Sequence, residues 1–237
     1  MDYKGIVILG LGPANADNLT REAWNWLSRL DEIWVRTRYH PVLSELQENL
    51  LIHSFDSEDE YNSFDFGTEI AKKIISFAQE QGKITYAVPG SPFISEETVR
   101  LIMRGVAGSQ IPVRVIDGMS FLEPVCSALG LDPHPKMVLT DSLYLASLEI
   151  PFFPASVPAI ISNLKPGLEA SDLKLTLMNN YPDEYPVKLI HNAGLADELV
   201  EEIPLYMLDQ SLHTGLMSTL YLPARENGRG FEDFQQI

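Results

Sequence analysis

Three turns rich in glycine, proline and serine follow apolar runs of the chain, and their residue types suit ligand binding. They are Gly10-Leu11-Gly12-Pro13, Pro89-Gly90-Ser91-Pro92 and Asp117-Gly118-Met119-Ser120. Glycine has no side chain, so a ligand can approach its backbone closely. Ligands of α/β folds bind at the carboxyl ends of strands, where these turns are expected to lie. The pattern therefore predicts a ligand site, and its simpler alternative is three tight turns that bind nothing.

Known nucleotide and nucleophile motifs match these turns only in part. A dinucleotide fingerprint requires a third glycine where this chain has Asn15, although an NAD-dependent oxidoreductase stays among the hypotheses. The second turn lacks the lysine of a phosphate-binding loop and the flanking glycines of a nucleophile elbow, so Ser91 is a weak nucleophile candidate. Asp117 can serve as an acid, a helix cap or a solvated turn residue. The chemical class of the ligand stays open.

Metal and redox chemistry find little support in the residue spacing. No histidine stands at a metal-ligand spacing from a cysteine, aspartate or glutamate, so no metal site is predicted. The histidines are His40, His53, His134, His191 and His213. The acidic run at residues 56–60 is expected to be a solvated loop, with magnesium binding as the alternative. The single cysteine, Cys126, excludes an internal disulfide and favours a reducing compartment.

The composition is that of a globular protein, with 45% hydrophobic and 21% charged residues. The 237 residues suffice for one large or two small domains. A formal net charge of -16 repels phosphate backbones, so a nucleic-acid partner is not expected. No apolar run is long enough to span a bilayer, and the N-terminal segment MDYKGIVILGLG is interpreted as a first strand rather than a signal peptide. We therefore expect a cytoplasmic protein without a membrane partner.

Strands and helices are predicted to alternate through the first half of the chain. Apolar runs predict strands at residues 5–9, 31–35, 84–88 and 113–116. Helices are predicted after Thr20, which is a suitable N-cap, over residues 70–81 with Gly82 as the stop signal, and over residues 95–105. This alternation is typical of βαβ units with a mainly parallel sheet.

The second half contains more proline and a less regular pattern. Strands are predicted at residues 159–162, 174–178, 188–191, 205–208 and 217–222. The last of these is expected at the outer edge of its sheet, because its residue types alternate. The predicted fold class is α/β, with a mainly parallel sheet in residues 1–118 and a mixed sheet in residues 119–223.

The order of the three turns resembles the motif pattern of the tetrapyrrole (corrin/porphyrin) methylase family. The family opens with G-x-G-P and a leucine-threonine helix start, which is similar to residues 10–13 and Leu19-Thr20. Its second motif, Gly-Asp-Pro, is similar to Gly90-Ser91-Pro92, and its third, Pro-Gly-x-Ser, is similar to residues 117–120. The resemblance implies two α/β subdomains of tetrapyrrole-methylase type, with S-adenosylmethionine in a ligand cleft between them.

The second half resembles the methylase-like domain that is fused to MazG-type nucleotide pyrophosphohydrolases. The segments that carry this resemblance are ASDLKLTLM at 170–178, YPDE at 181–184, HNAG at 191–194, PLY at 204–206 and STLY at 218–221. The tail FEDFQQI is similar to the entry of the pyrophosphohydrolase domain. The resemblance thus implies that residues 224–237 are a linker and the start of a truncated pyrophosphohydrolase domain of a larger bifunctional protein.

The resemblance also implies which residues contact the cofactor. They are Pro13, Pro89, Gly90, Ser91, Ile94, Ser120, Phe121, Asn163 and Gly194. The loop from Pro89 to Ile94 would wrap the methionine end of the ligand, and Gly194 would flank the adenine. Ser91 replaces the usual aspartate of the family, and Asn163 stands where many relatives have a methionine.

The leading hypothesis is an S-adenosylmethionine-dependent methyltransferase of tetrapyrrole-methylase type. Its product from the cofactor would be S-adenosylhomocysteine, its small-molecule acceptor is unknown, and the resemblance implies a homodimer. The alternative is a non-catalytic S-adenosylmethionine-binding or regulatory domain of a bifunctional nucleotide pyrophosphohydrolase. No catalytic residue is assigned, because methyl transfer depends mostly on proximity and alignment.

Overall fold

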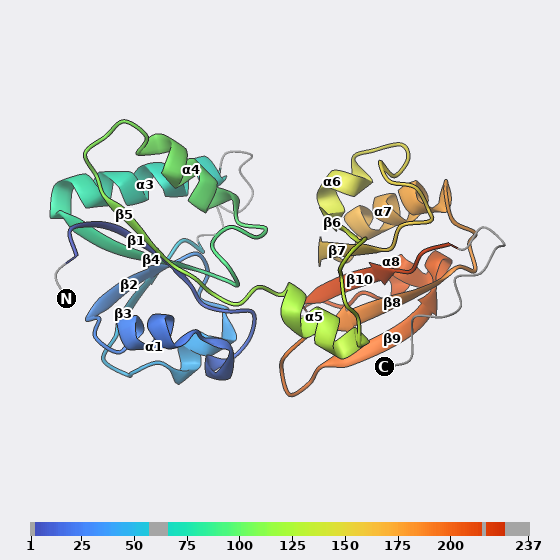
Figure 1. The fold of residues 1–237 in the computed structure, drawn as a ribbon, viewed down its shortest axis with the longest axis horizontal. Helices are drawn as coiled ribbons and strands as arrows, with labels where there is room; N and C mark the ends of the chain where they lie inside the picture. The colour runs from blue at the N-terminus through green and yellow to red at the C-terminus, as the bar shows by residue number, and fades with distance from the viewer. Residues whose placement is uncertain (1–2, 57–65, 215–216, 226–237) are drawn as a thin grey trace. The chain divides into compact units, whose positions relative to one another are not determined.

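The chain forms two compact units, residues 1–124 and 125–237, in the computed structural model (Figure 1). The structure describes residues 3–56, 66–214 and 217–225. The division falls inside the helix α5 (Leu122–Leu129), whereas the sequence pattern placed it between residues 118 and 119. Each unit has its own sheet and its own hydrophobic core.

A five-stranded parallel sheet forms the centre of the first unit, in the order β3-β2-β4-β1-β5. The strands are β1 (Gly5–Gly10), β2 (Glu32–Val35), β3 (Leu51–Ser54), β4 (Lys83–Val88) and β5 (Val113–Ile116). Every residue of β1 is buried. A parallel strand that is covered on both faces needs apolar side chains in both directions, which explains its uninterrupted run IVIL.

Helices cover both faces of this sheet (Figure 1). They are η1 (Ala16–Asn18), α1 (Arg21–Leu27), η2 (Pro41–Glu45), α3 (Phe66–Gln81) and α4 (Glu97–Gly105). Residues of α1 and η2 pack with Val7 and Leu9 on one face. Residues of α3 and α4 pack with Ile6 and Ile8 on the other. The parallel sheet with helices on both faces agrees with the predicted fold class.

Local signals in the sequence determine the helix ends. Thr20 caps α1 as predicted, because its Oγ1 accepts a hydrogen bond from the Ala23 N–H at 3.1 Å. Gly82 ends α3 as predicted, with a φ of +76°. The start of α4 is later than predicted, because Ser95 has a φ of +56° and the Glu96 side chain accepts from the Thr98 N–H at 3.0 Å instead.

The second unit contains a mixed five-stranded sheet in the order β6-β7-β10-β8-β9, in which only β6 and β7 are parallel neighbours. Its strands are β6 (Val138–Asp141), β7 (Ala159–Leu164), β8 (Pro186–His191), β9 (Leu199–Pro204) and β10 (Ser218–Leu222). The helices that follow α5 are α6 (Ser142–Ala146), α7 (Leu168–Met178), η3 (Leu205–Met207) and α8 (Leu208–Ser211). Residues of α7 and α8 pack with alternate residues of the strands in one core.

Two strands predicted in the second unit are wrong. Residues 174–178 belong to α7, in which Ala170, Leu173 and Leu177 are buried at helical spacing. Residues 205–208 form η3 and the start of α8, and the strand of this region is β9. That strand lies at the edge of the sheet and exposes Leu199 and Val200, so it lacks a buried pattern that sequence analysis could detect.

The position predicted for the last strand is also wrong. β10 is the third of five strands and pairs with both β7 and β8. The alternation that suggested an outer strand includes Ser218 and Thr219, and both of these polar residues are buried. Apart from Asp56, the acidic run at 56–60 lies outside the described residues, as does the tail from 226. No helix among the described residues has the length and apolarity to cross a membrane.

Candidate functional site

The carboxyl ends of β1, β4 and β5 are neighbours, because β1 lies between the other two strands. The chain leaves β1 toward β2 on one side of the sheet and leaves β4 toward β5 on the other side. Such a reversal is a topological switch point, the usual ligand-binding position of open α/β sheets. The three glycine turns follow these three strands, so the structure brings them together at this edge.

Backbone atoms of the three turns are in direct contact. The Gly90 N–H donates to Gly12 O at 2.7 Å, and the Gly12 N–H donates to Gly90 O at 3.2 Å. A Cβ added to Gly10 would lie 2.6 Å from Gly90 O, and one added to Gly118 would lie 2.8 Å from the Gly10 Cα. Side chains cannot be accommodated at these distances, so the contact between the turns itself requires Gly10 and Gly118.

Gly90 is required for a different reason. Its φ is +65°, and the nearest atom to an added Cβ would be Met119 O at 3.9 Å. The space beside the Gly90 Cα is therefore open, while its backbone adopts a conformation that disfavours side chains. Open space beside a partly exposed glycine backbone, at a switch point, is suited to close contact with a ligand.

Two other residues of the second turn complete the loop. The Ile94 N–H donates to Ser91 O at 3.2 Å, so these two residues close a tight turn after Pro89. Within the described part of the chain, no protein group hydrogen-bonds the Ser91 hydroxyl, which leaves it available for another group. Phe93, between them, is half exposed. The first turn contributes Pro13, which is buried and directly follows Gly12.

Ser120 and Phe121 lie at the start of α5, after the third turn. The Ser120 hydroxyl donates to Glu123 Oε2 at 2.5 Å and accepts from the Leu122 N–H at 3.1 Å. The spacing is that of a capping box, but here the Glu123 carboxylate accepts from the Ser120 hydroxyl and not from the Ser120 N–H. The hydroxyl of Ser120 is thus occupied by the protein itself, and only the backbone of this residue is available to a ligand.

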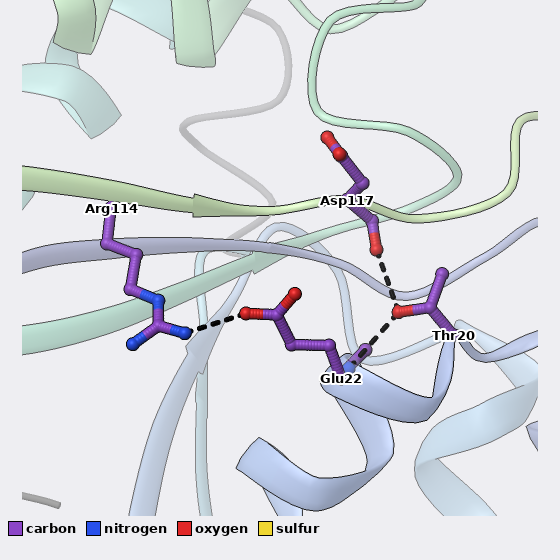
Figure 2. Close-up of polar contacts among 5 residues, drawn as sticks. Thr20, Glu22, Arg114 and Asp117 are labelled. Carbon is purple, nitrogen blue, oxygen red and sulfur yellow. Dashed lines mark hydrogen bonds and ion pairs between the residues drawn. The ribbon is translucent and has the colours of Figure 1, made fainter.

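The third turn is attached to α1 by the residue that caps this helix. Figure 2 shows Thr20 Oγ1 donating to the Asp117 carbonyl oxygen, at 3.0 Å, while the Asp117 carboxylate points away. Beside it, Glu22 of α1 pairs with Arg114 of β5 at 2.7 Å. The structural role of Asp117 is therefore carried by its backbone, and its exposed side chain takes no part.

His40 is a buried residue of this edge that sequence analysis did not select. Its Nε2 lies 2.9 Å from Gly12 O, and its Nδ1 accepts from the Val42 N–H at 3.4 Å. The ring is 6% exposed, and burial lowers the pKa of His40 below its ordinary value. The sequence shows this residue only as a histidine before a proline, and its partner lies 28 positions earlier in the chain.

Two asparagines near the first turn were likewise not selected. The side-chain oxygens of Asn15 and Asn18 are buried, and neither has a hydrogen-bond partner among the described residues. The Asn18 Nδ2 lies 3.9 Å from Met119 Sδ of the third turn. Buried carbonyl oxygens usually have partners. These two are therefore acceptors that the described protein groups leave unsatisfied.

The remaining predicted site residues, Asn163 and Gly194, belong to the second unit. Asn163 interrupts β7 with a φ of +60°, and its Nδ2 donates to Asp141 Oδ2 at 2.6 Å. Gly194 has a φ of +83°, and its N–H donates to Glu198 Oε2 at 2.8 Å. Non-glycine residues with positive φ are uncommon and often lie at functional sites.

Metal binding finds no group of residues to support it in the described parts of the chain. No three His, Cys, Asp or Glu side chains there are arranged to hold an ion. Glu22, near the third turn, pairs with Arg114, whereas the Asp117 carboxylate is exposed. The edge therefore presents backbone groups, amide oxygens and apolar side chains to a ligand.

Known proteins of similar sequence extend over most of the chain. The family model of tetrapyrrole (corrin/porphyrin) methylases matches residues 5–209. The "Uncharacterized protein YabN" of Bacillus subtilis (strain 168) is 31% identical over 220 residues, which are 92% of this chain and 44% of that protein. The chain thus spans less than half the length of this relative.

Solved structures of similar fold include methyltransferases. The uroporphyrin-III-C-methyltransferase of Thermus thermophilus is 20% identical with a TM-score of 0.69, over 94% of this chain and 93% of that chain. A structure of this methyltransferase complexed with S-adenyl homocysteine is 15% identical with a TM-score of 0.63, over 91% of both chains. These likenesses confirm the predicted fold. Together with the match over residues 5–209, they show that the chain belongs to the tetrapyrrole (corrin/porphyrin) methylase family.

Proposed function

We propose that this chain binds S-adenosylmethionine at the edge formed by the three glycine turns and transfers its methyl group to a small-molecule acceptor. One observation carries the proposal. The three turns contact each other through their backbones at a switch point, while the space beside Gly90 stays open. Membership of a methylase family supports S-adenosylmethionine over a dinucleotide as the ligand. The identity of the acceptor is not part of the proposal.

The residues at this edge fit the chemical groups of S-adenosylmethionine. The backbone from Pro89 to Ile94 can accept and donate hydrogen bonds around the amino-acid end, with Gly90 allowing close approach. The unpartnered oxygens of Asn15 and Asn18 can accept from amino or hydroxyl groups. Pro13 and Phe121 supply apolar surface. The proposal also retains the cofactor contacts predicted for Asn163, for Gly194 and for the backbone of Ser120.

When bound, this cofactor supplies a methyl group on a positively charged sulfur, and the sulfur keeps the bonding electron pair as the methyl group leaves. The contribution of the protein is to align acceptor and methyl group and to exclude water, which suffices for large rate enhancements. Ser91, where the family usually has aspartate, provides a neutral hydroxyl without a protein partner. We therefore propose that the chain holds the cofactor by shape and hydrogen bonds more than by charge.

The wider organisation of the protein is proposed on its relatives. Since the chain spans 44% of YabN, we propose that it is part of a longer polypeptide. Residues 1–118 and 119–223 would be the two methylase subdomains, and residues 224–237 would lead into a nucleotide pyrophosphohydrolase domain. We also propose a homodimer in the cytoplasm. Size-exclusion chromatography with light scattering tests the dimer.

Calorimetry and a turnover assay test the proposed function. S-adenosylmethionine and S-adenosylhomocysteine are titrated into the chain, and saturable binding with one site per chain is expected. Formation of S-adenosylhomocysteine is then measured over a panel of fractionated cell metabolites. Absence of binding by both ligands would refute the cofactor site. Binding of both without turnover on any fraction would instead indicate a domain that binds the cofactor without using it.

A further inference from the structure

The segment after β2 reaches the candidate site through His40. The Arg36 N–H donates to Ala87 O of β4 at 2.9 Å, so this segment starts beside the strand that leads to the second turn. Four residues later, His40 precedes η2 and places its ring against Gly12. The ring is buried, which fixes its position between two protein groups of opposite hydrogen-bonding character.

Only one protonation state of His40 satisfies both neighbours. Gly12 O is an acceptor, so Nε2 must carry a hydrogen to donate to it across 2.9 Å. The Val42 N–H is a donor, so Nδ1 must be without a hydrogen to accept from it. The neutral tautomer with hydrogen on Nε2 meets both conditions. A protonated ring would place an N–H of Nδ1 against the N–H of Val42.

The carbonyl oxygen of Gly12, to which His40 donates, also links the first turn to the second. Gly12 O accepts from the Gly90 N–H at 2.7 Å as well as from His40. We propose that His40 is a positioning residue, whose neutral ring fixes the Gly12 carbonyl and thereby the spacing between the first and second turns that cofactor binding requires. This inference rests on the proposed function. It adds a consequence, namely that cofactor binding weakens when the ring is protonated.

Charged groups on the neighbouring elements do not oppose this assignment. Glu45 of η2 is engaged with the Ala16 N–H at 3.3 Å, and the Arg38 Nε donates to Ser54 Oγ at 3.0 Å. The Arg36 guanidinium lies 4.5 Å from the centre of the Phe66 ring, and Asp17 of η1 is exposed. Among the described residues, none of these forms an ion pair with His40. Burial, which lowers the pKa of His40, therefore outweighs the hydrogen bond to Gly12 O, which raises it.

The direction of the pH dependence follows from burial. Because burial lowers the pKa of His40 from 6.5, the folded chain keeps the ring neutral where the unfolded chain starts to protonate it. The stabilising contribution is complete above about pH 6.5 and is lost as the pH falls from there toward the lowered pKa. Cofactor affinity should fall in the same direction, but only once the pH drops below the lowered pKa of the folded chain, with a limiting slope of about tenfold per pH unit for one proton.

Three proteins test the inference, namely the wild type, His40→Gln and His40→Leu. Their affinities for S-adenosylhomocysteine are measured by calorimetry between pH 5 and pH 8. The wild type should lose affinity in acid, and His40→Leu should bind about tenfold more weakly than the wild type at pH 8 and change little between pH 8 and pH 5. His40→Gln carries an amide donor that does not titrate. It should recover most of the loss and show a smaller pH slope than the wild type. An unchanged slope in His40→Gln would overturn the proposal, as would wild-type affinity in His40→Leu.

A control and a second measurement separate this inference from the proposed function. His53→Gln removes a histidine of β3 that stacks on Trp34 and does not contact Gly12, so the pH slope should stay that of the wild type. If the wild type bound no cofactor, the proposed function would fail while the role of His40 stayed testable. Hydrogen exchange of the Gly90 amide at pH 7 should then be faster in His40→Leu than in His40→Gln. Equal protection of this amide in both variants would refute the role of His40.

Discussion

Replacing Gly90 by leucine separates a block of the proposed site from damage to the fold. The structure predicts that the variant folds, because the nearest atom to the new Cβ would be Met119 O at 3.9 Å. The φ of +65° at this position imposes a backbone penalty of about 1–2 kcal/mol on any L side chain. This loss is small compared with the roughly 5–15 kcal/mol by which domains of this kind are stable. The variant should therefore be folded and measurable.

Binding should suffer far more than stability. The leucine side chain would occupy the open space beside the Gly90 backbone in which the ligand is proposed to lie. Affinity for S-adenosylhomocysteine should fall at least about 100-fold, which corresponds to about 2.7 kcal/mol. Calorimetry measures the affinity, and urea unfolding followed by circular dichroism measures the stability.

Gly82 offers a matched control for the same substitution. It has a φ of +76°, and no atom lies within 4 Å of an added Cβ, so Gly82→Leu incurs a similar backbone penalty. It precedes β4, whereas Gly90 follows the opposite end of that strand. Gly82→Leu should lose similar stability and retain its affinity. Normal binding by a folded Gly90→Leu, or an equal loss of affinity in both variants, would refute the assigned position of the ligand.

Three further substitutions test other contacts of the edge. Thr20→Val removes the cap of α1 and the bond to Asp117, so it should lower the free energy of unfolding in urea by about 1–2 kcal/mol. Thr20→Ser keeps the hydroxyl and should retain most of that stability. Gly118→Ala places a Cβ among the atoms of the first two turns and should lower the free energy of unfolding by about 3 kcal/mol. The control Gly108→Ala places its Cβ in open space and should lower it by about 1 kcal/mol. Equal losses in the two variants would contradict the close contact between the turns. Ser91→Asp adds a carboxylate near the proposed sulfonium and should favour S-adenosylmethionine over the uncharged S-adenosylhomocysteine up to about fivefold in calorimetry. An unchanged ratio would place Ser91 away from the sulfur.

The parts of the fold that sequence analysis predicted correctly are those with local signals. Strands β1, β4 and β5 are short apolar runs because helices cover both faces of the sheet. Thr20 and Gly82 act through hydrogen bonds within their own helix ends, so their residue types suffice to predict their roles. The errors occur where tertiary contacts decide. Residues 174–178 alternate as a strand would, yet the end of α7 is helical because its other turns bury leucines in the core.

The same distinction applies to the candidate site. The glycine turns were visible because close backbone contact requires a residue type that is easy to recognise. Sequence analysis missed His40, Asn15 and Asn18. Their roles depend on where they lie in the folded structure and not on their spacing along the chain. The His40 ring acts on Gly12 through a contact between loops, and the two asparagine oxygens differ from solvated ones only by being buried without partners. No pattern in the sequence around them signals these properties.

The contacts at this edge distinguish residues that determine its shape from residues that are free of that constraint. Gly10 and Gly118 cannot change without a collision between turns, and Gly90 cannot change without strain, so the shape of the edge depends on backbone alone. Ser91 faces no such restriction, because no group in the described part of the chain hydrogen-bonds its hydroxyl, whereas Asn163 is exposed but has a φ of +60° that few side chains adopt. At a net charge of -16, attraction of an anionic acceptor would need local positive charge, and Arg36 and Arg38, which follow β2 at the same end of the sheet, are the residues placed to supply it.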